Sequence, residues 1–128
     1  MTGLEVEVIG DALDEDTVTR ACVLAAATAG VEDGHVAVTF VTPEEIAALN
    51  AEHRGKPAPT DVLSFPVDGA DPPALGEREL GDVVICPEHT VDLTEAVVHG
   101  VLHLVGMDHE TDEGEMLAVQ AEIMGWLR

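Results

Sequence analysis

The spacing of hydrophobic residues predicts four strands in this chain. In residues 4–9 the apolar Leu4, Val6 and Val8 alternate with other residues, which is typical of a half-exposed strand. Three further segments, rich in β-branched or other apolar residues, predict strands at 35–41, 61–67 and 82–86. Residues 68–79 are rich in Gly, Pro and Asp and predict a loop before the last strand.

Hydrophobic residues spaced three or four apart predict four helices. The first lies between an N-cap in residues 14–17 and Gly30. The second begins with Thr42 as N-cap and Pro43 at its first position, and it ends before Gly55. The other two are expected at 94–105 and after a cap at 111–113. The 94–105 helix is apolar almost all round, which places it inside the fold.

These elements follow the order βαβαββαα within 128 residues, the size of one domain. We therefore expect a single α+β domain over residues 1–128, in which a mixed four-stranded sheet packs with about four helices. The chain shows no internal repeat and no linker that would divide it.

The formal net charge of −21, from 26 acidic and 5 basic residues, indicates an acidic and well-solvated surface. Such a charge argues against non-specific nucleic-acid binding, which depends on a basic surface. The bases are unevenly placed, because Arg54 and Lys56 lie in a stretch without acidic residues between Glu52 and Asp61. This local positive charge is compatible with a phosphate-bearing substrate that enters one cleft.

No apolar run is long enough to span a bilayer, and the N-terminal residues lack the features of a signal peptide. We therefore expect a cytoplasmic protein without membrane contact. In that compartment Cys22 and Cys86, far apart in the chain, are expected to be buried thiols rather than a disulfide or metal ligands.

Three histidines lie close together near the end of the chain. His99 and His103 are four residues apart on the predicted 94–105 helix, so their imidazoles share one face. Gly106 can end that helix and let the chain turn back to bring His109 to the same point. Three nitrogen ligands with an open fourth position are typical of a catalytic zinc site. We expect one Zn²⁺ on this central buried helix, although the ligand type also allows another divalent metal.

Position 100 is a glycine, where the HExxH helix of metalloproteases carries its general-base glutamate. This difference disfavours peptide cleavage. Spacing does not select the general base among Asp61, Asp108 and Glu110. Two other histidines, His35 and His89, are expected to face solvent and are given no role.

Several segments resemble the sequence signatures of one family. Residues 99–109 (HGVLHLVGMDH) resemble the HGxLHLxGxDH signature of the YbeY family, bacterial metal-dependent endoribonucleases of ribosomal RNA maturation. Residues 50–56 and 59–66 resemble its NxxYRxK and PTDVLSFP blocks, and residues 80–85 resemble its LGDIVI strand. The blocks follow one another in the order of the family.

The resemblance implies a single-domain α+β fold with zinc on His99, His103 and His109, and with Arg54 in the cleft beside the metal, where the family uses it for activity. It implies a single-strand-specific endoribonuclease acting in 3′-end maturation of 16S ribosomal RNA, ribosome biogenesis and ribosome quality control. The implied partners are ribosomal RNA and the small ribosomal subunit, together with a ribosomal protein and a ribosome-assembly GTPase.

The matching blocks also contain the expected substrate-binding residues. A guanidinium and a zinc ion can share the negative charge that develops during RNA cleavage, which is the role expected of Arg54. The alternative for Arg54 is a surface ion pair with Glu45 or Glu52. Further candidates are Lys56 for a phosphate contact, and Thr60, Asp61 and Ser64 for either lining the cleft or capping the end of a strand.

The chain departs from the family pattern at a few places. His53 replaces an aromatic residue, Ala58 a lysine and Met107 a tyrosine. The segment 87–95 is also too short for the additional helix that the family carries there. Two other functions are compatible with the residues: a metal-dependent hydrolase of peptides or small molecules, and a non-enzymatic ribosome-assembly factor with a structural metal.

Overall fold

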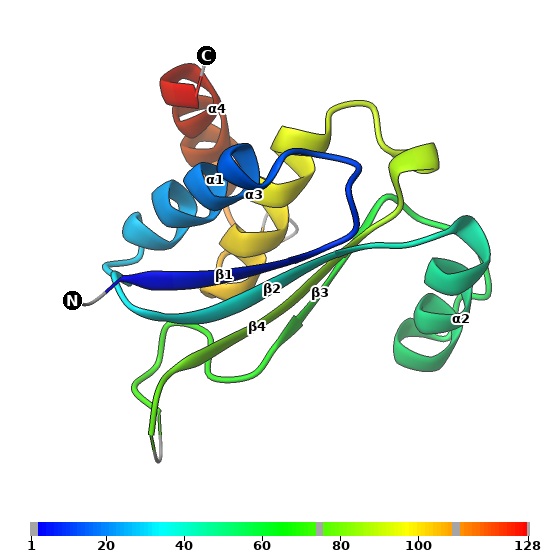
Figure 1. Cartoon of the computed structure of the whole chain (residues 1–128), viewed down its shortest axis with the longest axis horizontal. Helices are drawn as coiled ribbons and strands as arrows, with labels where there is room; N and C mark the ends of the chain where they lie inside the picture. Colours follow the sequence, from blue (N-terminus) through cyan, green and yellow to red (C-terminus); the bar gives the residue numbers. More distant parts are fainter. Residues whose placement is uncertain (1–2, 74–75, 109–110, 128) are drawn as a thin grey trace.

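A four-stranded mixed sheet forms the middle of the protein, with its strands in the order β1–β2–β4–β3 (Figure 1). The strands are β1 (Leu4–Ile9), β2 (Gly34–Phe40), β3 (Val62–Pro66) and β4 (Glu79–Ile85). The pairs β1–β2 and β2–β4 are parallel, whereas β3 pairs with β4 in the antiparallel sense. The computed structural model describes residues 3–73, 76–108 and 111–127.

Helices cover the two faces of the sheet unequally. They are α1 (Glu15–Ala27), α2 (Pro43–Arg54), α3 (Leu93–Leu104) and α4 (Glu115–Leu127). Helices α1 and α3 pack on one face and contact α4, and together they enclose the main hydrophobic core (Figure 1). Helix α2 covers one end of the other face, where Ile46 packs with Leu63 and Val84. A single 3₁₀ turn, Pro87–His89, fills the short segment between β4 and α3.

The predicted fold class and the order of the elements are confirmed. Helix α2 shows why local signals succeed: Thr42 Oγ1 accepts from Glu45 N, and Glu45 Oε1 accepts from Thr42 N. Gly55, with a φ of 71°, ends this helix in the left-handed conformation. The predicted start of the last strand is wrong, because β4 begins at Glu79, inside the expected loop, where it pairs with β2.

Helix α3 is the most buried helix of the domain, with apolar side chains turned toward the sheet and α1. Gly100 lies where the helix faces Val83 of β4, and the missing side chain allows close approach. Within the described residues, no helix is long and apolar enough to cross a bilayer.

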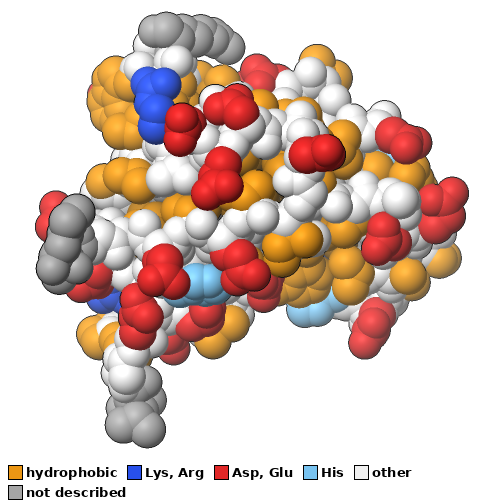
Figure 2. Space-filling model, in the orientation of Figure 1, with side chains coloured by type: hydrophobic (Ala, Val, Ile, Leu, Met, Phe, Trp, Pro, Cys, Tyr) orange, Lys and Arg blue, Asp and Glu red, His pale blue; other side chains and the backbone are white. Residues whose placement is uncertain are grey.

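The surface is acidic, as expected from the composition. Figure 2 shows acidic side chains spread over the face turned to the viewer, between hydrophobic ones and with little positive charge. Cys22 and Cys86 are both free and buried, which confirms their predicted role as core residues. Burial raises the pKa of the Cys22 thiol to about 12, so the thiol stays protonated and unreactive.

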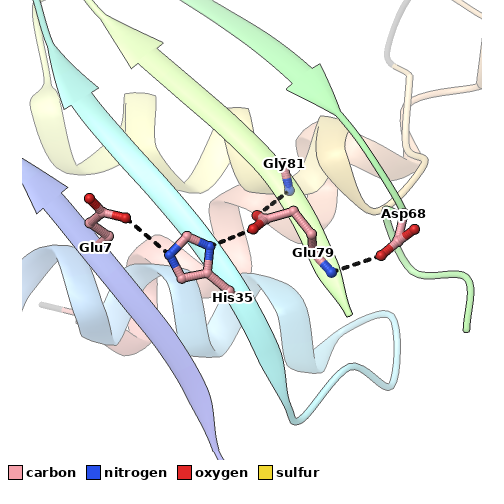
Figure 3. A network of polar contacts seen from close by, with 5 residues as sticks. All are labelled: Glu7, His35, Asp68, Glu79 and Gly81. Carbon is pink, nitrogen blue, oxygen red and sulfur yellow. Dashed lines mark hydrogen bonds and ion pairs between the residues drawn. The ribbon is translucent and has the colours of Figure 1, made fainter. Parts of the chain in front are cut away.

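His35 is less exposed than predicted, and it contacts two carboxylates. Its side chain is 24% exposed and lies on the sheet face opposite α1 and α3, between two carboxylates (Figure 3). Nδ1 lies 2.7 Å from Glu79 Oε1, and Nε2 lies 3.1 Å from Glu7 Oε1. Glu79 Oε2 also accepts from Gly81 N, and Glu79 N donates to Asp68 (Figure 3). The imidazole of His35 thereby links β1, β2 and β4. The pattern of residues along the chain does not reveal this link.

Candidate active site

His99 and His103 project from one face of α3 and are both half-buried. Their Nε2 atoms lie 3.2 Å apart, and their rings are inclined at 77°. Two nitrogens bound to zinc at tetrahedral geometry are about 3.3 Å apart, because each Zn–N bond is about 2.0–2.1 Å long. The separation of this pair therefore fits two ligands of one metal ion.

A residue of α4 orients the first histidine. Gln120 Oε1 lies 2.7 Å from His99 Nδ1. A carbonyl oxygen only accepts hydrogen bonds, so Nδ1 carries the proton and the lone pair of the ring lies on Nε2, toward His103. Sequence reasoning missed Gln120. Its signal is a polar residue on the face of α4 that carries the buried Met116 and Ile123.

His109, the third predicted ligand, and Glu110, a candidate base, lie outside the described residues. In the part of the chain that the structure describes, no three His, Cys, Asp or Glu side chains are grouped to hold a metal. The two described nitrogens and their spacing fit a metal ion, and the third ligand stays a prediction.

A cleft of about 830 Å³ opens beside the histidine pair. Its walls come from the end of α2, from residues 60–66, from α3 and from residues 106–108. The structure brings six of the predicted site residues to this cleft: Arg54, Thr60, Asp61, Ser64, His99 and His103. Lys56 is exposed and is not among the lining residues.

Arg54 is the last residue of α2, and Gly55 ends the helix immediately after it. Its exposed side chain lines the cleft and forms no ion pair with a described residue. The alternative ion pair with Glu45 is absent, because that carboxylate caps its own helix. The guanidinium is therefore placed where an anionic ligand can enter.

The three candidates on and before β3 have local structural roles as well. Asp61 Oδ1 accepts from Val62 N at 2.8 Å and from Thr60 Oγ1 at 3.3 Å, so it caps the start of the strand. Ser64 Oγ donates to the carbonyl oxygen of Gly100 at 3.0 Å and ties β3 to α3. These three residues therefore line the cleft and also form hydrogen bonds that hold β3 in place.

His53 and Asp108 also line the cleft. The His53 ring contacts Phe65 edge-on, with ring centroids 4.5 Å apart. The only hint in the sequence is that His53 stands beside Arg54 where the family has an aromatic residue. Asp61 and Asp108 are the described carboxylates among the lining residues.

The position of Gly100 argues against peptide cleavage, one of the alternative functions. The position faces Val83 of the sheet and is not part of the cleft lining. A glutamate there would overlap β4 instead of reaching the histidine pair. Helix α3 therefore cannot carry a general base at the position that metalloproteases use.

Comparisons with known proteins place this chain in a family. The family model described as Endoribonuclease YbeY matches residues 7–128. A protein of that name from Rubrobacter xylanophilus is 43% identical over 125 residues, covering 93% of this chain and 89% of the relative. One from Geobacillus kaustophilus is 40% identical over 134 residues, covering 85% of this chain and 83% of the relative.

A solution structure of a Thermotoga maritima protein has a similar fold, with a TM-score of 0.57 and 25% sequence identity. The alignment covers 95% of this chain and 88% of that protein. The match to the family model spans both walls of the cleft, and the relatives are similar over most of their length. The chain belongs to the endoribonuclease YbeY family.

Proposed function

We propose that this protein is a single-strand-specific, zinc-dependent endoribonuclease that matures the 3′ end of 16S ribosomal RNA. The observation that carries the proposal is the shared cleft of Arg54 and the His99–His103 pair. A permanent cation and two nitrogen ligands in one cleft suit a substrate whose reacting group is a phosphodiester. Family membership supports RNA as the substrate.

The residues of the cleft divide the chemistry among them. His99 and His103, with His109 as the predicted third ligand, would hold zinc, which supplies Lewis-acid activation of water and of a phosphate oxygen when bound. Arg54 binds the non-bridging phosphate oxygens and stabilises the negative charge that grows on them. Asp61 and Asp108 line the same cleft and are the described candidates for proton acceptor.

Preference for single strands follows from charge. The chain carries 26 acidic and 5 basic residues, so a long rigid duplex is repelled over its whole length. A flexible strand can bend one phosphate toward Arg54 and keep the others away from the acidic surface. The same acidity makes free RNA a weak ligand.

We propose that other molecules supply the missing affinity in the cell. The partners are the small ribosomal subunit, a ribosomal protein and a ribosome-assembly GTPase, which fits a role in ribosome biogenesis and quality control in the cytoplasm. Basic ribosomal proteins would complement the acidic surface of this chain.

The test is cleavage of a labelled single strand with the precursor 3′-end sequence, and of its duplex, by zinc-loaded protein. Arg54→Ala should lower kcat by about a hundredfold or more, as loss of a charge-stabilising group does elsewhere. His103→Ala should lose both zinc and cleavage. Arg20→Ala is the matched control, because Arg20 is exposed on α1 and away from the cleft.

Circular dichroism should show that each variant is folded. The proposal fails if the wild-type protein cleaves no RNA with zinc bound. It also fails if cleavage survives both Arg54→Ala and His103→Ala, since the activity would then belong to a contaminant. Equal cleavage of duplex and single strand would remove the strand preference.

A further inference from the structure

Helix α4 turns one polar side chain inward, toward the histidine pair. Its other polar residues, Glu115 and Glu122, are exposed, whereas Gln120 is half-buried near the buried Ile123 and Met124. Placing an amide there costs hydration unless the amide gains a hydrogen bond in return. The 2.7 Å contact between Gln120 Oε1 and His99 Nδ1 supplies that bond.

We propose that Gln120 is a positioning residue, through which α4 sets the tautomer and ring orientation of His99 for metal binding. The inference rests on the proposed function, because it concerns the metal of that site. A histidine ligand holds a metal with one nitrogen and needs a partner for the other, and such partners strengthen metal binding. Gln120 occupies this place from a different helix, 21 residues along the chain.

The geometry indicates that Gln120 orients the His99 ring and does not merely fill space beside it. The hydrogen bond places the proton on Nδ1 of His99. The unprotonated Nε2 can then bind a metal through its lone pair, and it lies 3.2 Å from His103 Nε2. Rotation of the ring or a change of tautomer would take the lone pair away from this point. Removing the acceptor should therefore weaken metal binding even when the volume of the side chain is kept.

Two substitutions separate hydrogen bonding from packing. Gln120→Met keeps the length and volume of the side chain but removes the carbonyl acceptor. Gln120→Glu keeps an acceptor oxygen and supplies the carboxylate common behind histidine ligands. Glu122→Met is the matched control on the same helix, because Glu122 is exposed.

The measurements are the zinc dissociation constant, by competition with a chromophoric chelator, and the visible absorption spectrum of the Co²⁺-substituted protein. We expect Gln120→Met to weaken zinc binding by about tenfold to a hundredfold and to alter the Co²⁺ bands. Gln120→Glu should stay close to wild type or bind zinc more tightly. Glu122→Met should behave as wild type. In a His99→Ala background, Gln120→Met should have no further effect.

Opposite results would overturn the inference. It fails if Gln120→Met binds zinc as wild type does, or if Gln120→Glu weakens binding as much as Gln120→Met. A wild-type protein that binds no zinc would overturn both the inference and the proposed function. Zinc binding that follows the expected order without RNA cleavage would overturn the proposed function alone.

Discussion

Gly100 of α3 lies against Val83 of β4 so closely that a Cβ at position 100 would be 2.4 Å from Val83 Cγ1. The same turn of the helix carries His99, and the carbonyl oxygen of Gly100 accepts a hydrogen bond from Ser64 on β3. The glycine therefore sets how deeply the histidine-bearing helix sits on the sheet. The position of His99 and His103 in the wall of the cleft depends on this contact.

Gly100→Ala should destabilise the protein, although alanine is the better helix former. Alanine gains about 1 kcal/mol of helix propensity, while overpacking a filled core costs about 1–3 kcal/mol. The overlap involves a short, stiff valine side chain packed in the core, so we expect the overlap to dominate. Denaturant unfolding should show a net loss of up to about 2 kcal/mol.

Val83→Ala provides the control for this prediction. It removes the Cγ atoms that the new Cβ would meet, at the cost of a cavity when made alone. The double variant should therefore lose less stability than the sum of the two single variants. Simple additivity would show that the contact between Gly100 and Val83 is not the cause.

The His35 network should make stability depend on pH. Burial lowers the pKa of His35, but hydrogen bonds and charges of Glu79 and Glu7 outweigh it and raise the pKa above the ordinary value. A raised pKa in the folded state means that the stabilisation is complete below the unfolded pKa of about 6.5. It is lost as the pH rises through the folded pKa.

His35→Gln should therefore lower Tm clearly at about pH 6 and little at about pH 9. His89→Gln is the matched control, because His89 is exposed on the 3₁₀ turn, and its replacement should leave the pH dependence of Tm as in wild type. A Tm difference for His35→Gln that is larger at high pH would contradict the assigned direction.

Salt should stabilise this protein. The net charge is −21, and the ion pairs found among the described residues involve only Glu7, Glu79 and Asp33 as acidic partners. From about 0.01 M to about 1 M salt the Debye length falls from about 30 Å to about 3 Å, which screens repulsion between the acidic side chains. Tm should rise over this range in both NaCl and KCl. A fall would show that attractive pairs dominate.

His53 should contribute to RNA binding by stacking. Its ring lines the cleft beside Arg54 and is held by its edge contact with Phe65. Stacking of a base on an aromatic side chain contributes about 1–3 kcal/mol. We expect His53→Ala to raise the KM for a short single strand by about tenfold. His53→Tyr should retain the KM of the wild type, because tyrosine can also stack on a base.

The outcome for His53 separates two explanations. If stacking is the cause, His53→Tyr retains binding at every pH tested. If His53→Tyr is as weak as His53→Ala, the ring acts through its nitrogen atoms instead. Zinc content should be unchanged in both variants, since His53 is not among the expected ligands.

Elements that depend on near neighbours were predictable. The start of α2 at Thr42–Pro43 and its end at Gly55 follow from contacts within a few residues. The strand Leu4–Ile9 was predictable from its alternating pattern of apolar residues. The i, i+4 spacing of His99 and His103 belongs to the same class, because the geometry of a helix alone brings their rings together. The signature blocks between residues 50 and 109 likewise indicate the family, because each is a continuous run of residues that can be read along the chain.

Features that join distant segments were decided by tertiary structure. The start of β4 at Glu79 depends on pairing with β2, and the His35 bridge depends on Glu7 and Glu79 from two other strands. Gln120 meets His99 only because α4 packs on α3. A single sequence shows which residues are polar but not which ones meet, because long-range contacts depend on strand order and helix packing. Local spacing therefore determined the His99–His103 pair, and the packing of α2 and β3 beside α3 determined the cleft.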